Sequence, residues 1–203
     1  MEGGYGIGSP RARALAVAAA LLAFVASSAG AGGQAAGAAA GCGVRGRALL
    51  GTLGDGGARG VRLTPRTTSI AALAARPRPG RLPHRRDGFE RRAWRVVAQI
   101  TEYRLAPDGS VRLILFDAGS YMRVELPPLA CLTRRTPARR AIVATRTRFL
   151  AACGAATPEW RDLGAVGYVT GVGFWGSRTV RQAAPNGAAL RPVLSLRLVA
   201  GCR

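Results

Sequence analysis

Residues 94–126 read WRVVAQITEYRLAPDGSVRLILFDAGSYMRVEL. Apolar and polar side chains alternate in three runs, which is the two-residue period of half-buried β-strands. Pro107–Ser110 (PDGS) separates the first two runs and predicts a hairpin, because an Asp-Gly pair tolerates the positive backbone angles of a tight turn. Asp117–Ser120 (DAGS) turns the chain again. We therefore predict three consecutive antiparallel strands.

A helix and two more strands are predicted after this stretch. Thr136 is a suitable N-cap, Pro137 suits the first helical position, and apolar residues then recur on one face as far as Gly154. Strands follow at residues 167–175 and 190–199. In the first of these, glycines at alternate positions indicate strong curvature or a close approach of backbones.

The element order predicts the fold class. Three strands, a helix and two strands are the order of an OB-fold barrel. We predict a mainly β fold, a small OB-fold-like five-stranded barrel with one helix between strands 3 and 4, plus a short N-terminal helix. The alternative is a small β-sandwich or roll with one packed helix.

The N-terminus has the features of a secretion signal. Arg11 and Arg13 precede an apolar run at residues 14–26, and small residues near Ala29 and Ala31 fit a cleavage site. The run is shorter than the roughly 20 residues that cross a bilayer. We expect a secreted or extracytoplasmic protein with no transmembrane anchor.

A lipid anchor at Cys42 is the alternative to a free exported chain. Residues 39–42 (AAGC) resemble the end of a lipoprotein signal. The apolar run ends well upstream, and Ala39 stands where a large aliphatic residue belongs. We therefore expect no lipid at this cysteine.

The sequence divides into four segments. We predict a signal peptide at 1–31, a flexible Gly/Ala-rich segment at 32–48, an N-terminal extension at 49–92 and the OB-like domain at 93–203. In the extension, the sequence TTSIAALAAR at 67–76 predicts a short capped helix. The arginines and prolines that follow it indicate a loop or linker.

The composition is strongly basic. Arginine supplies all 30 basic residues, since lysine is absent, against 10 acidic ones, and the formal net charge is +20. Abundant alanine, glycine and arginine are typical of a GC-rich genome, so codon usage explains part of this charge. An arginine-rich surface attracts polyanions whatever its origin.

The four cysteines indicate two disulfides. Cys42, Cys131, Cys153 and Cys202 are widely spaced, and a single histidine accompanies them, which disfavours zinc. In an exported chain cysteines normally form disulfides. Of the three possible pairings, we favour Cys42–Cys202 with Cys131–Cys153.

The sequence contains no recognisable catalytic constellation. The only histidine, His84, lies in the arginine-rich loop, so Ser-His-Asp and Cys-His chemistry would have no placed base. Glu102 and Glu125 would face each other across the sheet, where charge pairing with arginines is the favoured interpretation. We expect no enzyme activity, no metal and no cofactor.

The predicted functional feature is a basic barrel face. Arginines on the polar sides of strands, with tyrosines nearby, can contact phosphates and stack bases. The candidate binding residues are Arg112, Arg123, Arg191, Arg197, Tyr103 and Tyr121. The alternative is a solvated surface that is rich in arginine because the genome is.

Three short stretches near the C-terminus, GVGFW (171–175), APNG (184–187) and LRPVL (190–194), carry a resemblance. They are similar to the signature TGVGFFD…HGQ…APNGIELHPVL of a family of uncharacterised secreted bacterial proteins. The resemblance extends over roughly residues 42–200 and implies no activity. The framework residues that this chain retains are Gly171, Gly173, Phe174, Pro185, Asn186, Gly187 and Pro192.

The chain departs from that signature at polar positions. Gly176 stands where the family has aspartate, and Ala189 and Arg191 replace the glutamate and histidine of ELHP. Arg112 replaces a histidine in the second strand. A polar or metal site in relatives would be dismantled here.

The expected function follows from the basic face and the missing catalytic groups. We predict a non-catalytic exported binding module for anionic polymers, with cell-envelope polyanions or extracellular nucleic acid as partners. The alternatives are an extracellular nuclease-like hydrolase and a structural envelope protein without a specific ligand. The sequence does not predict the oligomeric state.

Overall fold

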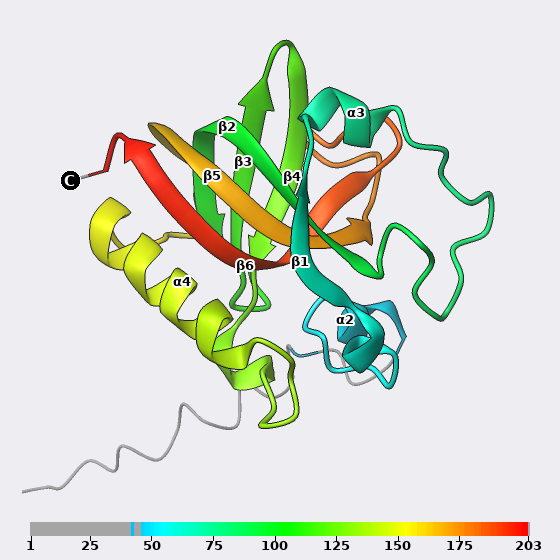
Figure 1. The fold of residues 1–203 in the computed structure, drawn as a ribbon. Helices are drawn as coiled ribbons and strands as arrows, with labels where there is room; N and C mark the ends of the chain where they lie inside the picture. Colours follow the sequence, from blue (N-terminus) through cyan, green and yellow to red (C-terminus); the bar gives the residue numbers. More distant parts are fainter. Residues whose placement is uncertain (1–41, 43–45, 203) are drawn as a thin grey trace, which may run out of the picture. The chain divides into compact units, whose positions relative to one another are not determined.

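A computed structural model describes Cys42 and residues 46–202 of the chain (Figure 1). The predicted signal peptide at 1–31 lies outside the described residues. So does the predicted flexible segment at 32–48, apart from Cys42 and the residues from Gly46 onward, where a short helix begins. No helix within the described part of the chain is long and apolar enough to span a membrane.

The described residues form six strands and several short helices. In chain order they are α2 (Arg47–Leu50), η1 (Ala58–Gly60), β1 (Arg62–Thr67), α3 (Ile70–Ala74), β2 (Arg92–Leu105), β3 (Val111–Asp117), β4 (Ser120–Leu126), η2 (Leu129–Cys131), α4 (Arg139–Cys153), β5 (Arg161–Trp175) and β6 (Ala188–Ala200). The prediction of a mainly β fold is confirmed, with one strand more than expected.

All six strands belong to one sheet in the order β1-β2-β3-β4-β6-β5, and β2 also pairs with β5. The last five strands in that order therefore form a closed ring of pairings. β4 and β6 are parallel, and the other pairs of the ring are antiparallel. β1 adds to β2 in parallel outside the ring. Figure 1 shows the long, curved β5 and β6 crossing β2 to β4.

The core lies inside this ring. Trp94, Val96, Ala98 and Ile100 of β2 are buried, which confirms the predicted alternation. Their counterparts on the other strands join them in one apolar cluster with Phe149 of α4. Since α4 packs against β6, the helix covers one side of the sheet (Figure 1).

The glycines of β5 make close backbone contacts, as predicted. A Cβ on Gly171 would lie 2.8 Å from the Cβ of Leu190 and 3.0 Å from the carbonyl oxygen of Pro192. A Cβ on Gly173 would lie 2.8 Å from ring carbons of Phe89. Side chains at these positions would push β6 and the Phe89 loop away from β5.

Two local predictions need correction. α4 begins at Arg139, later than expected, because the Thr136 hydroxyl accepts a hydrogen bond from the Thr133 N–H (3.1 Å) and closes the preceding turn instead of capping the helix. Ala138, with φ 56°, precedes the first turn. β1 was not predicted, because Pro65 and two arginines hide its strand pattern.

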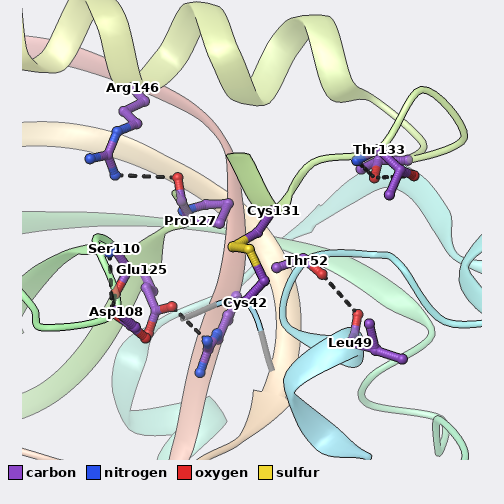
Figure 2. The surroundings of a disulfide bond; sticks show 12 residues. Cys42, Leu49, Thr52, Asp108, Ser110, Glu125, Pro127, Cys131, Thr133 and Arg146 are labelled. Carbon is purple, nitrogen blue, oxygen red and sulfur yellow. Dashed lines mark hydrogen bonds and ion pairs between the residues drawn. A yellow bond between two sulfur atoms is a disulfide. The ribbon is translucent and has the colours of Figure 1, made fainter. Parts of the chain in front are cut away.

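Two disulfides form, as predicted, but the favoured pairing was wrong. Cys42 bonds Cys131 (Figure 2), and Cys153 bonds Cys202. The Cα–Cα distances are 5.2 and 4.6 Å, respectively. Cys131 precedes α4 and Cys153 ends it. A helix of that length spans about 20 Å, far beyond the reach of a disulfide.

The arginine-rich segment after α3 is fixed to the domain and is not a free linker. Arg86 is only 3% exposed, and its Nη2 donates to a carboxylate oxygen of Asp55 and to the carbonyl oxygen of Leu50, both at 2.6 Å. Its Nη1 donates to the carbonyl oxygen of Glu90 (3.2 Å). The extension predicted at 49–92 is therefore part of the same packed unit.

Two other arginines hold this segment at the end of β5. Arg47 forms an ion pair with the fully buried Glu90 and donates to the carbonyl oxygen of Trp175 (3.0 Å). Arg78 donates to the carbonyl oxygens of Gly176 (2.9 Å) and Asn186 (2.8 Å). Part of the arginine content is therefore structural.

We expect Arg86→Ala to lower the free energy of unfolding by about 3–5 kcal/mol, because it removes one partner of a buried ion pair. Asp55 then loses its cation, and the carbonyl groups of Leu50 and Glu90 lose this donor. Arg85→Ala, at the exposed neighbouring arginine, is the matched control and should change it by no more than about 0.5 kcal/mol. Urea denaturation of the oxidised proteins measures both. Equal effects would contradict a structural role for Arg86.

Candidate functional site

Three predicted binding residues meet at one pocket of about 220 Å³. Arg112 comes from β3, Arg123 from β4 and Arg191 from β6. The segment that connects β5 to β6 supplies apolar lining, including Val180 and Ala183. The pocket is thus basic on the sheet side and partly apolar on the side of the connection.

Strand register brings these side chains together. Arg112 pairs across the β3–β4 ladder with Glu125, and Arg123 pairs across the β4–β6 ladder with Ala189. Outward positions of three adjacent strands therefore share one surface. Gly51, at the end of α2, leaves room for Arg191, since a Cβ there would lie 2.7 Å from the Arg191 Cδ.

One buried carboxylate lies among the three arginines. Glu125 is 8% exposed, with Arg191 Nη2 at 2.8 Å from Oε1 and Arg112 Nε at 3.8 Å from Oε2. Arg112 also lies 3.5 Å from Asp108. This confirms the interpretation of Glu125 as a charge partner of arginines on neighbouring strands. Arg123 forms no ion pair with any described residue.

The two carboxylates of the site are shifted in opposite directions. Burial raises the pKa of Glu125, and the charge of Arg191 only partly opposes this. Burial also acts to raise the pKa of Asp108, but hydrogen bonds from Ser110 and the charge of Arg112 outweigh it and lower that pKa (Figure 2). The ionised form is therefore favoured at Asp108 and disfavoured at Glu125.

Arg123 lies in a cationic environment. Burial lowers the pKa of its guanidinium, and the nearby charge of Arg112 lowers it further. Arginine nevertheless stays protonated in proteins. An unpaired, half-buried guanidinium next to a second one is a favourable place for a bound anion.

The other three predicted binding residues lie elsewhere. Tyr103 is 1% exposed and donates its hydroxyl to the Cys153 carbonyl oxygen (2.8 Å), so it is a core residue that no ligand can stack on. Tyr121 is 37% exposed and packs on Phe116, outside the pocket lining. Arg197 lies over the ring of Tyr168, at a different hollow of the surface.

The framework residues shape the wall formed by the β5–β6 connection. Asn186 donates to the carbonyl oxygens of Leu73 and Arg76, both at 2.9 Å, and accepts from the Ala188 N–H. Gly187 adopts a φ of 74°, where a side chain would be strained. Pro185 lies next to Asn186 in this connection, and Pro192 follows it in β6. Their role is structural.

Phe174 is both a framework residue and part of the pocket lining. The guanidinium carbons of Arg47 and Arg191 lie 5.0 and 5.3 Å from the centre of its ring. Such cation–π contacts orient a guanidinium. Phe174 therefore helps to hold Arg191 at the pocket.

The departures from the resembled signature also converge here. Arg112, Gly176, Ala189 and Arg191 all line this pocket, although they come from three separate parts of the sequence.

The sequence analysis did not identify Arg181 as important. Its Nη2 lies 2.7 Å from Glu102 Oε1, and this ion pair joins the β5–β6 connection to β2. No local pattern marks a loop arginine of this kind.

Comparisons with known proteins give little further information. No protein-family model matches the sequence, and no curated protein does. Among solved structures, a Leishmania major Friedlin protein provisionally assigned as an aspartyl-tRNA synthetase matches with 11% identity and a TM-score of 0.42. The match covers 70% of this chain and 22% of that one, and a likeness at this level carries no argument.

We expect Glu125→Gln to become more stable relative to the parent protein as pH rises from about 4 to 7. Because folding raises the pKa of Glu125, its stabilising contribution is full below the unfolded-state pKa and lost as pH rises through the folded-state pKa. Glutamine does not titrate, so the variant does not lose stability in this way as pH rises. Urea midpoints across that pH range test the trend, with the exposed Glu159→Gln controlling for one lost charge. If the stability of Glu125→Gln relative to the parent protein fell as pH rose, the expected role of Glu125 would be contradicted.

Proposed function

We propose that the chain is an exported, non-catalytic binding module for anionic ligands, and that an anionic group of the ligand enters the pocket of Arg112, Arg123 and Arg191. The observation that carries the proposal is the convergence of three arginines from three strands on one pocket. A single buried carboxylate lies among them, and Arg123 has no ion-pair partner among the described residues.

The position of the pocket in the fold supports a binding role. We propose that the ring is an OB-fold barrel, since its strand order, its parallel pair and the helix between its third and fourth strands fit that fold. OB-folds bind ligands on strands 2 and 3 and the loops joining strands 1–2 and 4–5. The corresponding elements here are β3, β4, the β2–β3 turn with Asp108, and the β5–β6 connection.

The chemistry of the lining indicates the ligand class. Guanidinium groups pair with phosphate, sulfate or carboxylate through two parallel hydrogen bonds. Val180, Ala183 and Phe174 add apolar surface for the body of the ligand. A pocket of about 220 Å³ suits one anionic group with its attached unit. Cell-envelope polyanions and extracellular nucleic acid both carry such groups.

Export and family membership complete the proposal. The two disulfides suit an oxidising compartment outside the cytoplasm, where a signal peptide at residues 1–31 would direct the chain. We also propose kinship with the secreted family that the C-terminal signature resembles. No three His, Cys, Asp or Glu residues gather at one place in the described part of the chain, so the nuclease-like alternative gains no specific support.

We expect Arg123→Ala to weaken binding of an anionic polymer about tenfold, because it removes a charged contact that no described carboxylate competes for. The measurement is the affinity for single-stranded DNA across a salt series. With DNA, the double variant Arg112→Ala/Arg123→Ala should also lower the salt slope by about 1.4, since each lost phosphate contact counts about 0.7.

The matched control is Arg134→Ala/Arg135→Ala. It removes two exposed arginines, ahead of α4, that make no ion pair with a described residue. Affinity should change little in this variant. Equal losses in the pocket and control variants would mean that net charge alone attracts the polymer, and the proposed pocket would then be wrong.

We further expect affinity to rise as pH falls through the raised pKa of Glu125, because the neutral carboxyl no longer competes for Arg112 and Arg191. Glu125→Gln should bind more tightly at pH 7 and lose this pH dependence. Dextran sulfate is the suitable probe, since its sulfate groups stay ionised throughout the range. A pH dependence retained in Glu125→Gln would contradict the competition.

A further inference from the structure

The outward face of β2, β5 and β6 carries a second polar surface that shares no lining residue with the arginine pocket. The ladders align it in two rows. Arg95, Thr170 and Ser195 lie opposite one another on β2, β5 and β6. Two residues along each strand, Val97, Tyr168 and Arg197 form the adjacent row. We call these two rows the β2–β5–β6 strip.

The strip is hollowed and its side chains are held in place. Arg95, Tyr168, Thr170, Ser195 and Arg197 line a depression of about 260 Å³. Arg95 Nε donates to the Thr170 hydroxyl (3.2 Å), and the Arg197 guanidinium lies 4.4 Å from the centre of the Tyr168 ring. These contacts preorient both guanidinium groups.

The arginines of the strip have no ion-pair partner among the described residues. The ion pairs among the described residues belong to Arg47, Arg86, Arg112, Arg181 and Arg191. Neither Arg95 nor Arg197 takes part in one, and no carboxylate lines the hollow. Two preoriented cations and the exposed Ser195 hydroxyl therefore face solvent, which complements an anionic, hydroxyl-bearing partner.

We propose that the β2–β5–β6 strip binds an acidic polysaccharide, independently of the arginine pocket. The arginines pair with its sulfate or carboxylate groups, and the exposed Ser195 hydroxyl pairs with a sugar hydroxyl. Val97, in the second row of the strip, is 43% exposed and offers apolar surface to the C–H faces of the sugar rings.

The same features disfavour nucleic acid as the partner of the strip. Proteins that bind single strands stack successive bases on aromatic side chains. The hollow is lined by one aromatic ring, that of Tyr168, and the guanidinium of Arg197 lies over it. Two arginines can also neutralise few phosphates, and the electrostatic part of nucleic-acid binding grows with the number of phosphates that are neutralised.

The test compares Arg95→Gln/Arg197→Gln with the parent protein for binding to a size-defined heparin fragment and to single-stranded DNA. We expect the affinity for heparin to fall about tenfold or more, and the affinity for DNA to change less than about twofold. Arg197→Gln alone, at an exposed residue, repeats the test without touching the Arg95–Thr170 bond. Arg134→Gln/Arg135→Gln is the charge-matched control.

A second measurement needs no variant. Phenylglyoxal modifies accessible arginines, and mass spectrometry locates the products. Heparin should protect Arg95 and Arg197 in the oxidised parent protein. Lack of protection, or unchanged heparin affinity in both strip variants, would overturn the proposal.

The outcomes separate this proposal from the proposed pocket. If heparin binding is lost in Arg123→Ala but kept in the strip variants, the proposal for the strip is wrong and the proposal for the pocket stands. If heparin binding is lost in the strip variants but kept in Arg123→Ala, the strip is supported and the pocket is not the heparin site. Equal losses of DNA and heparin binding in the strip variants would overturn the assignment to polysaccharide.

Discussion

The pairing of β2 with β5 closes the ring of strands, and the rest of the structure depends on it. Without this ladder the sheet would end in two open edges, and its inner side chains would face water. The pairing requires β5 to contact β2 on one side and β6 on the other while it bends. Gly171 and Gly173 make this possible, because any side chain there would collide with β6 or with Phe89.

Arginine serves two purposes around this ring. Arg47 and Arg78 donate to backbone carbonyl groups at and after the end of β5, and Arg86 binds the loop after α3 to Asp55 and to the Leu50 carbonyl group. A planar guanidinium with five donors satisfies several carbonyl groups at once, and lysine would not reproduce this geometry. Arginines at the pocket and the strip instead point outward. A net charge counted from the sequence does not separate the two groups.

The sequence predicted the elements whose patterns are local. Alternation from Trp94 to Ile100, the Asp-Gly turn and the Ser69 cap of α3 depend on neighbouring residues, and the structure has all three. The length of the predicted helix already excludes the Cys131–Cys153 pairing that we favoured. The choice between the other two pairings could not be predicted, because it depends on where the ends of α4 lie in the fold. β1 is held by a ladder to a strand far along the chain, and its own sequence resembles a loop.

Only part of the candidate site could be predicted from the sequence, because the rest depends on contacts between strands that are distant along the chain. Arg191 and Arg197 lie on β6, six residues apart, and alternation places them on one face. β6, however, pairs with β4 only near its start, and its register against β5 shifts three times. Arg191 therefore joins Arg112 and Arg123, whereas Arg197 joins Arg95. The sequence alone predicts one basic face. The structure has two separate surfaces, because β6 curves and shifts its register between Arg191 and Arg197.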